Sequence, residues 1–273
     1  MKRKILALDL DGTLTNSRKE ITAKARQAIR EIQKQGHLVV LASGRPTPGA
    51  QAVADQLKLY QYGGYLLSYN GARVTDCKTG ELLYQATMPQ DVVPGIFAMA
   101  EDLEMGMMTY QNDGIVAGSR VDEYMELEAR INGLEIRSYG DPAAQLRDPV
   151  NKCLGTAAPE IAVEIEQKYA DVFGQKINVG RSEPFFIELT PMGVDKASSL
   201  ERLCHLIGCD RENIIACGDG FNDKCMIQYA GIGVAMANAQ EVVKEAADYI
   251  TEKTNDEDGI VEVIEKFILN SLA

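Results

Sequence analysis

The chain has few of the residues on which zinc sites, membrane spans and nucleic-acid surfaces depend. It contains only two histidines, and none of its six cysteines forms a Cys-x-x-Cys pair, which argues against a zinc site. No apolar run approaches the roughly 18 residues that a membrane-spanning helix needs, so no membrane partner is expected. Basic residues number 28 against 40 acidic ones, for a net charge of −12. Such a chain is a poor binder of nucleic acid, although a few cations or a metal can still create a local site for a phosphorylated substrate.

The cysteines and the first residues indicate a reduced, cytoplasmic protein. Six cysteines would permit three disulfides, but 273 residues can bury an adequate core without them. Cys153 and Cys217 lie in apolar runs, where buried free thiols are common. The basic start followed by apolar residues mimics a signal peptide, yet Asp9 and Asp11 interrupt the run and no cleavage pattern follows.

Both ends of the chain alternate buried strands with amphipathic helices. Apolar runs at 4–10 and 38–42 predict strands, and helical spacing over 22–35 predicts a helix between them. The same order returns near the C-terminus, with a helix at 195–207, strands at 213–217 and 231–235, and helices at 239–246 and 259–269. Strand–helix–strand units form parallel sheets covered by helices. We therefore predict a doubly wound, mainly parallel, Rossmann-like α/β core.

The middle of the chain has a different pattern, which predicts an inserted domain. Strand-like pieces lie near 106–110, 114–118, 177–180 and 185–189, with a helical pattern over 159–173. The stretch from Ser43 to Lys196 is far longer than the roughly dozen residues that a crossover connection needs. We predict a catalytic core of residues 1–83 and 189–273, with an α+β cap of residues 84–188 over the carboxyl ends of the core strands. Segments near 83 and 189 would be hinges.

Polar residues follow the predicted core strands at their carboxyl ends, where open α/β sheets bind ligands. Carboxylates gathered without histidine or cysteine favour a hard cation, and Mg²⁺ fits best. One carboxylate at a strand end can attack phosphorus, and a second one two residues later can protonate the leaving oxygen and then activate water. The pattern predicts Mg²⁺-assisted phosphoryl transfer through an aspartyl-phosphate. The residues concerned are Asp9, Asp11, Ser43, Lys196, Asp219, Asn222 and Asp223.

Four motifs, in order along the chain, resemble those of the haloacid dehalogenase superfamily. They are Asp9-Leu10-Asp11-Gly12-Thr13-Leu14, then Ala42-Ser43-Gly44-Arg45, then Lys196 preceded by Gly193-Val194-Asp195, and finally Gly218-Asp219-Gly220-Phe221-Asn222-Asp223. The segments 69–72, 186–191 and 233–239 are similar to those of Cof-type phosphatases. The long insert lies between the second and third motifs, which is the placement of a type IIB cap. The resemblance covers essentially the whole chain.

The resemblance implies a role for each matching residue. Asp9 would be the nucleophile, and Asp11 the general acid and base. An aspartate at position 11 favours hydrolysis, because related P-type ATPases carry threonine there and keep a longer-lived phosphoenzyme. The implied phosphate-binding residues are Leu10, Ser43, Gly44, Lys196 and Asn222. The implied Mg²⁺ site comprises Asp9, the backbone carbonyl of Asp11, Asp219, Gly220 and Asp223, the last either supporting the metal or holding Lys196.

The expected function is Mg²⁺-dependent hydrolysis of small phosphorylated metabolites, with sugar phosphates the leading class. One alternative is a phosphomutase of sugar phosphates, because type IIB caps occur there too. A second alternative is a non-catalytic, ligand-binding regulator, because fold does not fix function. The intact acidic set argues against the regulator, since an unused cluster of close carboxylates is electrostatically costly. The sequence is compatible with a monomer or a homodimer.

Overall fold

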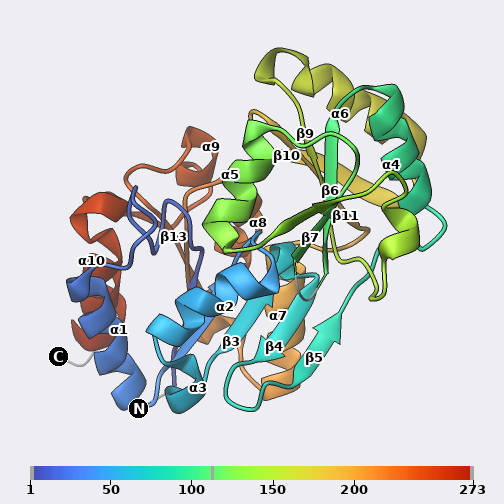
Figure 1. The fold of residues 1–273 in the computed structure, drawn as a ribbon. Helices are drawn as coiled ribbons and strands as arrows, with labels where there is room; N and C mark the ends of the chain where they lie inside the picture. The colour runs from blue at the N-terminus through green and yellow to red at the C-terminus, as the bar shows by residue number, and fades with distance from the viewer. Residues whose placement is uncertain (1–2, 112–113, 271–273) are drawn as a thin grey trace. The chain divides into compact units, whose positions relative to one another are not determined.

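The computed structural model describes residues 3–111 and 114–270, and these residues form two compact units (Figure 1). The first unit contains the described residues up to 44, residues 50–84, and those from 195 onward. The second unit contains residues 45–49 and 85–194. In the described part of the chain, no helix has both the length and the apolar character that a bilayer crossing requires.

The described residues of the first unit build an eight-stranded sheet in the order β14-β13-β12-β1-β2-β3-β4-β5. Neighbouring strands from β14 to β3 run parallel, and β4 runs antiparallel to β3. In the central pairs, Ile5 lies opposite Ile214 on one side and Leu38 on the other. The strands are β1 (Ile5–Leu8), β2 (Leu38–Ala42), β3 (Tyr65–Ser68), β4 (Arg73–Asp76), β5 (Leu82–Gln85), β12 (Ile214–Gly218), β13 (Ile232–Ala235) and β14 (Tyr249–Ile250).

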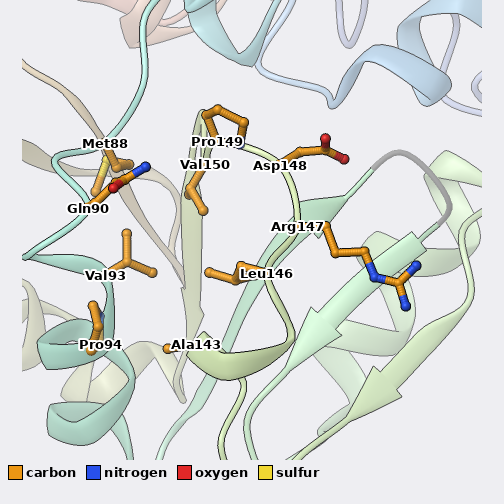
Figure 2. Close-up of a pocket in the computed structure, with 10 residues that line it drawn as sticks. All are labelled: Met88, Gln90, Val93, Pro94, Ala143, Leu146, Arg147, Asp148, Pro149 and Val150. Carbon is orange, nitrogen blue, oxygen red and sulfur yellow. The ribbon is translucent and has the colours of Figure 1, made fainter.

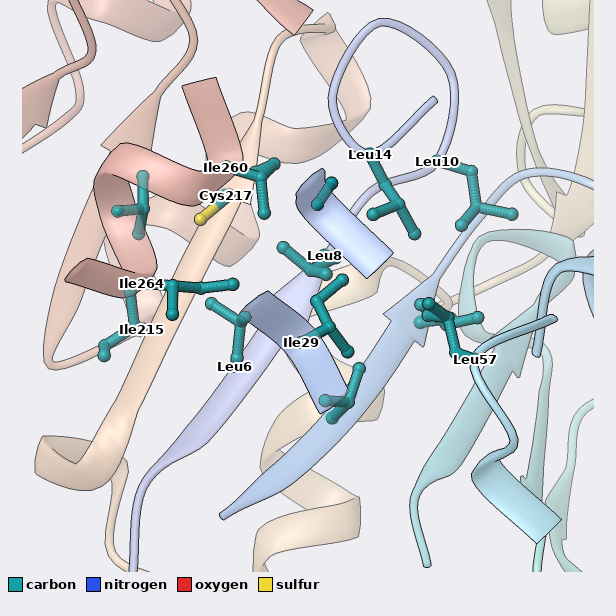
Figure 3. Packing of buried hydrophobic residues seen from close by; sticks show 14 of the residues in the cluster. Leu6, Leu8, Leu10, Leu14, Ile29, Leu57, Ile215, Cys217, Ile260 and Ile264 are labelled. Carbon is teal, nitrogen blue, oxygen red and sulfur yellow. The ribbon is translucent and has the colours of Figure 1, made fainter. Parts of the chain in front are cut away.

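Helices cover both faces of this sheet, because successive side chains of a strand point to opposite sides. Leu6 and Leu8 of β1 pack with Ile29 on one face (Figure 3), while Ile5 packs with Leu200 on the other. The prediction of a doubly wound, mainly parallel α/β core is confirmed. Its helices are α1 (Ala23–Lys34), α2 (Thr47–Gln56), α3 (Leu59–Tyr62), α7 (Lys196–Ile207), α8 (Lys224–Tyr229), α9 (Glu241–Lys244) and α10 (Gly259–Ile264).

One of the predicted C-terminal helices is shorter than the sequence pattern indicates, and another changes its hydrogen-bond pattern along its length. The predicted helix over 239–246 is reduced to α9, because Gln240 has an extended backbone, with ψ of 147°, and is the N-cap of a helix that begins at Glu241. The predicted helix over 259–269 is α10 followed by a π-helical turn, Glu265–Leu269. The Gln240 amide donates to the Asp219 carbonyl at 3.0 Å, so a contact with the loop after β12 holds the residue before α9.

The second unit is an α+β structure whose described strands form a six-stranded sheet in the order β10-β11-β9-β6-β7-β8. Helices α4 and α6 pack on it through Ile96, Phe97, Ile165 and Tyr169. The Tyr110 hydroxyl donates to Glu128 of helix α5 at 2.7 Å. The strands are β6 (Gly106–Gln111), β7 (Gly114–Ala117), β8 (Ile136–Ser138), β9 (Cys153–Thr156), β10 (Ile177–Glu183) and β11 (Phe186–Pro191), and the helices α4 (Val93–Asp102), α5 (Glu123–Asn132) and α6 (Pro159–Phe173).

Candidate active site

The carboxyl ends of β1, β2 and β12 bring three of the sequence motifs together. These strands are neighbours in the sheet, and Leu8 pairs with Leu41 on one side and with Cys217 on the other. The amide of Asp9 continues the ladder by donating to the Cys217 carbonyl at 3.0 Å. Asp9, Ser43 and Asp219 therefore follow adjacent strand ends, because the buried apolar runs before them are in register.

Three carboxylates form a cluster at this edge of the sheet. One carboxylate oxygen from each of Asp9, Asp219 and Asp223 lies within 4.8 Å of the other two. Burial and the negative charge of Asp223 raise the pKa of Asp9 well above its ordinary value. The same two causes raise the pKa of Asp219 to about 6, although the Thr13 hydroxyl opposes the shift by donating to Asp219 Oδ1 at 2.9 Å. A divalent cation would relieve this repulsion, and three close oxygen donors suit Mg²⁺.

Lys196 is fully buried between two of these carboxylates. Its ammonium donates to Asp9 Oδ1 and to Asp223 Oδ1, each at 2.6 Å. Burial alone would lower the pKa of Lys196, but the negative charges of Asp223 and Asp9 outweigh burial and raise this pKa above its ordinary value. Lys196 therefore stays charged and compensates part of the cluster's negative charge.

Asp223 holds both Lys196 and the turn after β12. Its Oδ1 accepts the Lys196 ammonium, while its Oδ2 accepts the amides of Asp219 and Gly220 at 3.0 and 2.9 Å. Because the two oxygens fix a cation and two backbone donors, Asp223 orients its neighbours whether or not it also contacts a metal. A side chain on Gly218 would collide with Asp223, since a Cβ there would lie 2.3 Å from the Asp223 Cβ.

The predicted phosphate-binding residues lie in the loops beside this cluster. Ser43 is buried, and its amide donates to the Leu67 carbonyl at 2.8 Å. Leu10 lies directly after Asp9, and its carbonyl accepts the amide and the hydroxyl of Thr15. Asn222 donates through Nδ2 to Asn70 Oδ1 at 3.0 Å, and Asn70 Oδ1 also lies against Gly44.

Asp11 lies outside the three-carboxylate cluster, although its negative charge adds to the causes that raise the pKa of Asp9 and of Asp219. The ammonium of Lys19 lies 2.8 Å from Asp11 Oδ1, and both side chains are partly exposed. Lys19 has a left-handed backbone with φ of 62°, in a tight turn in which the Asn16 side chain accepts the amides of Arg18 and Glu20. Sequence reasoning missed Lys19, because a lysine in a polar loop carries no signal of its own.

Two asparagines that sequence reasoning did not assign to the site hold the loop after Asp11. Asn238 Nδ2 donates to the Gly12 carbonyl at 2.8 Å, and Asn255 Nδ2 donates to the Thr15 carbonyl at 2.9 Å. The two are joined by a bond from the Asn255 amide to Asn238 Oδ1. Gly12 has φ of +85°, and a Cβ there would lie 2.3 Å from Asp219 Oδ2, so the close approach of this loop to the cluster requires glycine.

A separate pocket of about 380 Å³ lies within the second unit, between α4 and the segment 143–150 (Figure 2). Its walls are mixed, with Val93, Leu146 and Val150 facing it beside polar groups, whereas Arg147 points away from its centre. The pocket contains none of the site residues predicted from the sequence.

Comparisons with known proteins agree with the motifs. The sequence profile of the haloacid dehalogenase-like hydrolases matches residues 6–264. YcsE of Bacillus subtilis strain 168, a 5-amino-6-(5-phospho-D-ribitylamino)uracil phosphatase, is 29% identical over 97% of this chain and 96% of its own. The structure of a haloacid dehalogenase-like hydrolase from Bacteroides thetaiotaomicron superposes with a TM-score of 0.93 at 46% identity, covering 98% of this chain and 100% of that one. The subclass IIB sugar phosphatase BT4131 superposes with a TM-score of 0.82 at 25% identity, over 97% and 98% of the two chains.

Proposed function

Because the chain belongs to the haloacid dehalogenase-like hydrolase family, we propose that this phosphatase cleaves small phosphorylated metabolites through an aspartyl-phosphate on Asp9, with Mg²⁺ as cofactor. The observation that carries the proposal is the position of Asp9. Its buried carboxylate lies at the end of a central strand, with the Lys196 ammonium 2.6 Å away and two further carboxylates beside it. Such a site suits a nucleophile that meets a dianionic phosphate.

The proposed metal site is made of oxygen donors alone. The carboxylates of Asp9 and Asp219 and the backbone carbonyl of Asp11 would hold Mg²⁺, with Gly220 and Asp223 supporting them from the turn after β12. When bound, Mg²⁺ supplies positive charge next to the phosphate and the carboxylates. The donor set fits this ion because three close carboxylates share a single buried ammonium, which leaves the cluster negatively charged.

In the proposed reaction an oxygen of Asp9 bonds to phosphorus and the ester P–O bond breaks. Asp11 gives a proton to the departing alkoxide and then takes one from the water that hydrolyses the aspartyl-phosphate. The Lys196 ammonium stabilises the negative charge on the phosphate oxygens. The Ser43 hydroxyl, the Asn222 carboxamide and the amides of Leu10 and Gly44 complete the proposed phosphate site.

The proposed substrates are phosphate esters of polyhydroxylated carbon chains, with sugar phosphates first. BT4131 is a sugar phosphatase, and the substrate named for YcsE carries its phosphate on a ribityl chain. We assign the chemistry to the proposed core, residues 1–83 and 189–273, and recognition of the leaving group to the inserted cap, residues 84–188. A cytoplasmic location, and a monomeric or homodimeric state, stay predictions from the sequence.

The test is phosphate release from a panel of sugar phosphates, polyol phosphates, nucleotides and an aryl phosphate. Each is measured with Mg²⁺, with EDTA, and with the Asp9→Asn protein. We expect release to require Mg²⁺, and Asp9→Asn to lower kcat by about a thousandfold or more while melting near the wild-type temperature. Substantial turnover by Asp9→Asn would contradict the mechanism. Isomerisation that needs a bisphosphorylated activator, with little phosphate release, would instead indicate a mutase.

A further inference from the structure

The turn after β3 has an unusual backbone at a buried position. Tyr69, Asn70 and Gly71 have φ values of 55°, 56° and 94°, so three successive residues are left-handed and two of them carry a Cβ. Such conformations are costly for residues other than glycine, and they persist only where the surroundings hold them in place. Tyr69 and Asn70 are both buried. This backbone therefore requires an explanation beyond a simple change of chain direction.

The turn touches the segments that carry the proposed phosphate-binding residues. The Asn70 amide donates to the Ser43 carbonyl at 2.9 Å, and a Cβ on Gly44 would lie 3.1 Å from Asn70 Oδ1. The Ser199 hydroxyl donates to the Gly71 carbonyl at 2.7 Å. Since Ser199 lies one turn after Lys196 on α7, the turn joins the loop after β2 to the helix that supplies the buried lysine.

Asn70 also contacts the loop after β12 through its side chain. Asn70 Oδ1 accepts Asn222 Nδ2 at 3.0 Å, across 152 residues of sequence. A Cβ on Gly220 would lie 3.0 Å from Asn222 Oδ1, so the oxygen of the Asn222 carboxamide lies against Gly220. With one N–H donated to Asn70, the second N–H of the same nitrogen is available to an anion.

We propose that Asn70 is a positioning residue of the phosphate site and acts through Asn222. Asn70 Oδ1 accepts Asn222 Nδ2 and so holds the Asn222 carboxamide in one orientation, with its nitrogen toward the phosphate. The opposite orientation of the same carboxamide would present its oxygen to the phosphate. The inference rests on the proposed function, in which Asn222 binds a phosphate oxygen. Asparagine tolerates a left-handed backbone, and glycine adopts it at least as easily. The backbone of the turn is therefore no reason for asparagine rather than glycine. The contact with Asn222 is what glycine cannot supply.

The experiment is a double-mutant cycle with Asn70→Gly and Asn222→Ala. Glycine fits the left-handed backbone, so Asn70→Gly removes the carboxamide and leaves the turn its conformation. For the best substrate of the panel, we expect Asn70→Gly to raise KM, and the inhibition constant of inorganic phosphate, by about tenfold, with a smaller effect on kcat. The KM and the phosphate inhibition constant of the double variant should equal those of Asn222→Ala alone. The effects of the two substitutions are not additive when one residue acts through the other. Lys58→Gly is the matched control, since Lys58 also has a left-handed backbone, with φ of 56°.

Either of two results would overturn the inference. Wild-type KM and phosphate inhibition in Asn70→Gly would show that the carboxamide is not needed, and fully additive losses in the double variant would show that Asn70 does not act through Asn222. Failure of the proposed function gives a different result, because the wild-type protein itself would then release no phosphate from any panel member. Thermal melting of the wild type and all four variants checks that each is folded.

Discussion

Lys19 and Asp11 form an ion pair that should orient the Asp11 carboxylate but contribute little to the free energy of folding. The side chains are 45% and 33% exposed, and their N–O distance is 2.8 Å. Exposed pairs of this kind contribute about 0–1 kcal/mol to folding. The loop is fixed independently, because Asn238 and Asn255 hold the carbonyls of Gly12 and Thr15. What the Lys19 ammonium adds is a preferred direction for the Asp11 carboxylate.

We expect Lys19→Met to change the free energy of unfolding by less than about 0.5 kcal/mol but to lower kcat severalfold for an alkyl phosphate. The decrease in kcat should be much smaller for an aryl phosphate, because its leaving oxygen needs little protonation by an acid. Phosphate release from both substrates, with urea denaturation, checks this. Arg18→Met is the control, because Arg18 pairs with the exposed Glu20 in the same loop. Equal losses on the two substrates would show that Lys19 does not act through Asp11.

Helix α7 delivers Lys196 because its first turn is capped at the residue before it. The Asp195 side chain accepts the Ser198 amide at 2.7 Å, and the Ser198 hydroxyl accepts the Asp195 amide at 3.2 Å. This capping box fixes where the helix begins, so the next residue enters the core as the first residue of the helix. A cap on the helix thus sets the position of a charged group that lies deep in the site.

We expect Asp195→Ala to lower the free energy of unfolding by about 1 kcal/mol and also to lower kcat, because the start of α7 frays. Asp122→Ala is the matched control: Asp122 caps α5 in the second unit, where its side chain accepts the Met125 amide at 2.9 Å. It should cost at least as much stability, because Asp122 Oδ2 also accepts the Thr156 hydroxyl at 2.6 Å, with little loss of kcat. Urea denaturation and phosphate release measure both quantities. A kcat for Asp195→Ala equal to that of the control would refute the link between the cap and the lysine.

Repulsion between the clustered carboxylates opposes folding of the whole chain. The chain carries a net charge of −12, and three of its carboxylates are gathered in the cluster with one buried lysine. Burial and Asp223 raise the pKa of Asp219 to about 6 in the folded state, from 3.8. The folded protein therefore binds this proton more tightly than the unfolded chain does. Asp219 stabilises the fold fully below about pH 4, and that contribution is lost as the pH rises through about 6.

In EDTA, we expect the wild type to lose stability between pH 4 and 6 relative to Asp219→Asn, by about 3 kcal/mol, since each pKa unit corresponds to about 1.4 kcal/mol. Asp219→Asn removes the titrating group together with its effect on Asp9, whose pKa the Asp219 charge also raises, so the difference between the two proteins reports Asp219 and its coupling to Asp9. Guanidinium denaturation at a series of pH values provides the measurement. Adding Mg²⁺ at pH 7 should raise the wild-type melting temperature more than that of the variant. A difference that is flat or opposite in sign across this interval would contradict the expectation.

Local pattern and motif spacing were enough to predict the framework of the molecule. The apolar runs before Asp9, Ser43 and Asp219 mark three neighbouring strand ends, and the predicted helix over 159–173 agrees with α6. These features are visible in sequence because strands and helices have periods of two and 3.6 residues, and because the motifs are contiguous. The family resemblance rests on the same contiguous residues.

Only the tertiary structure decided which polar side chains support those motifs. Asn238 reaches Gly12 across 226 residues and Asn70 reaches Asn222 across 152, while the raised pKa of Asp219 depends on burial beside Asp223. The same kind of contact holds the residue before α9, since the Gln240 amide donates to the Asp219 carbonyl. Contacts between distant residues leave no periodic signal in the chain. They arise when the sheet brings its strand ends together. Burial then strengthens the hydrogen bonds and the interactions between charges at that edge.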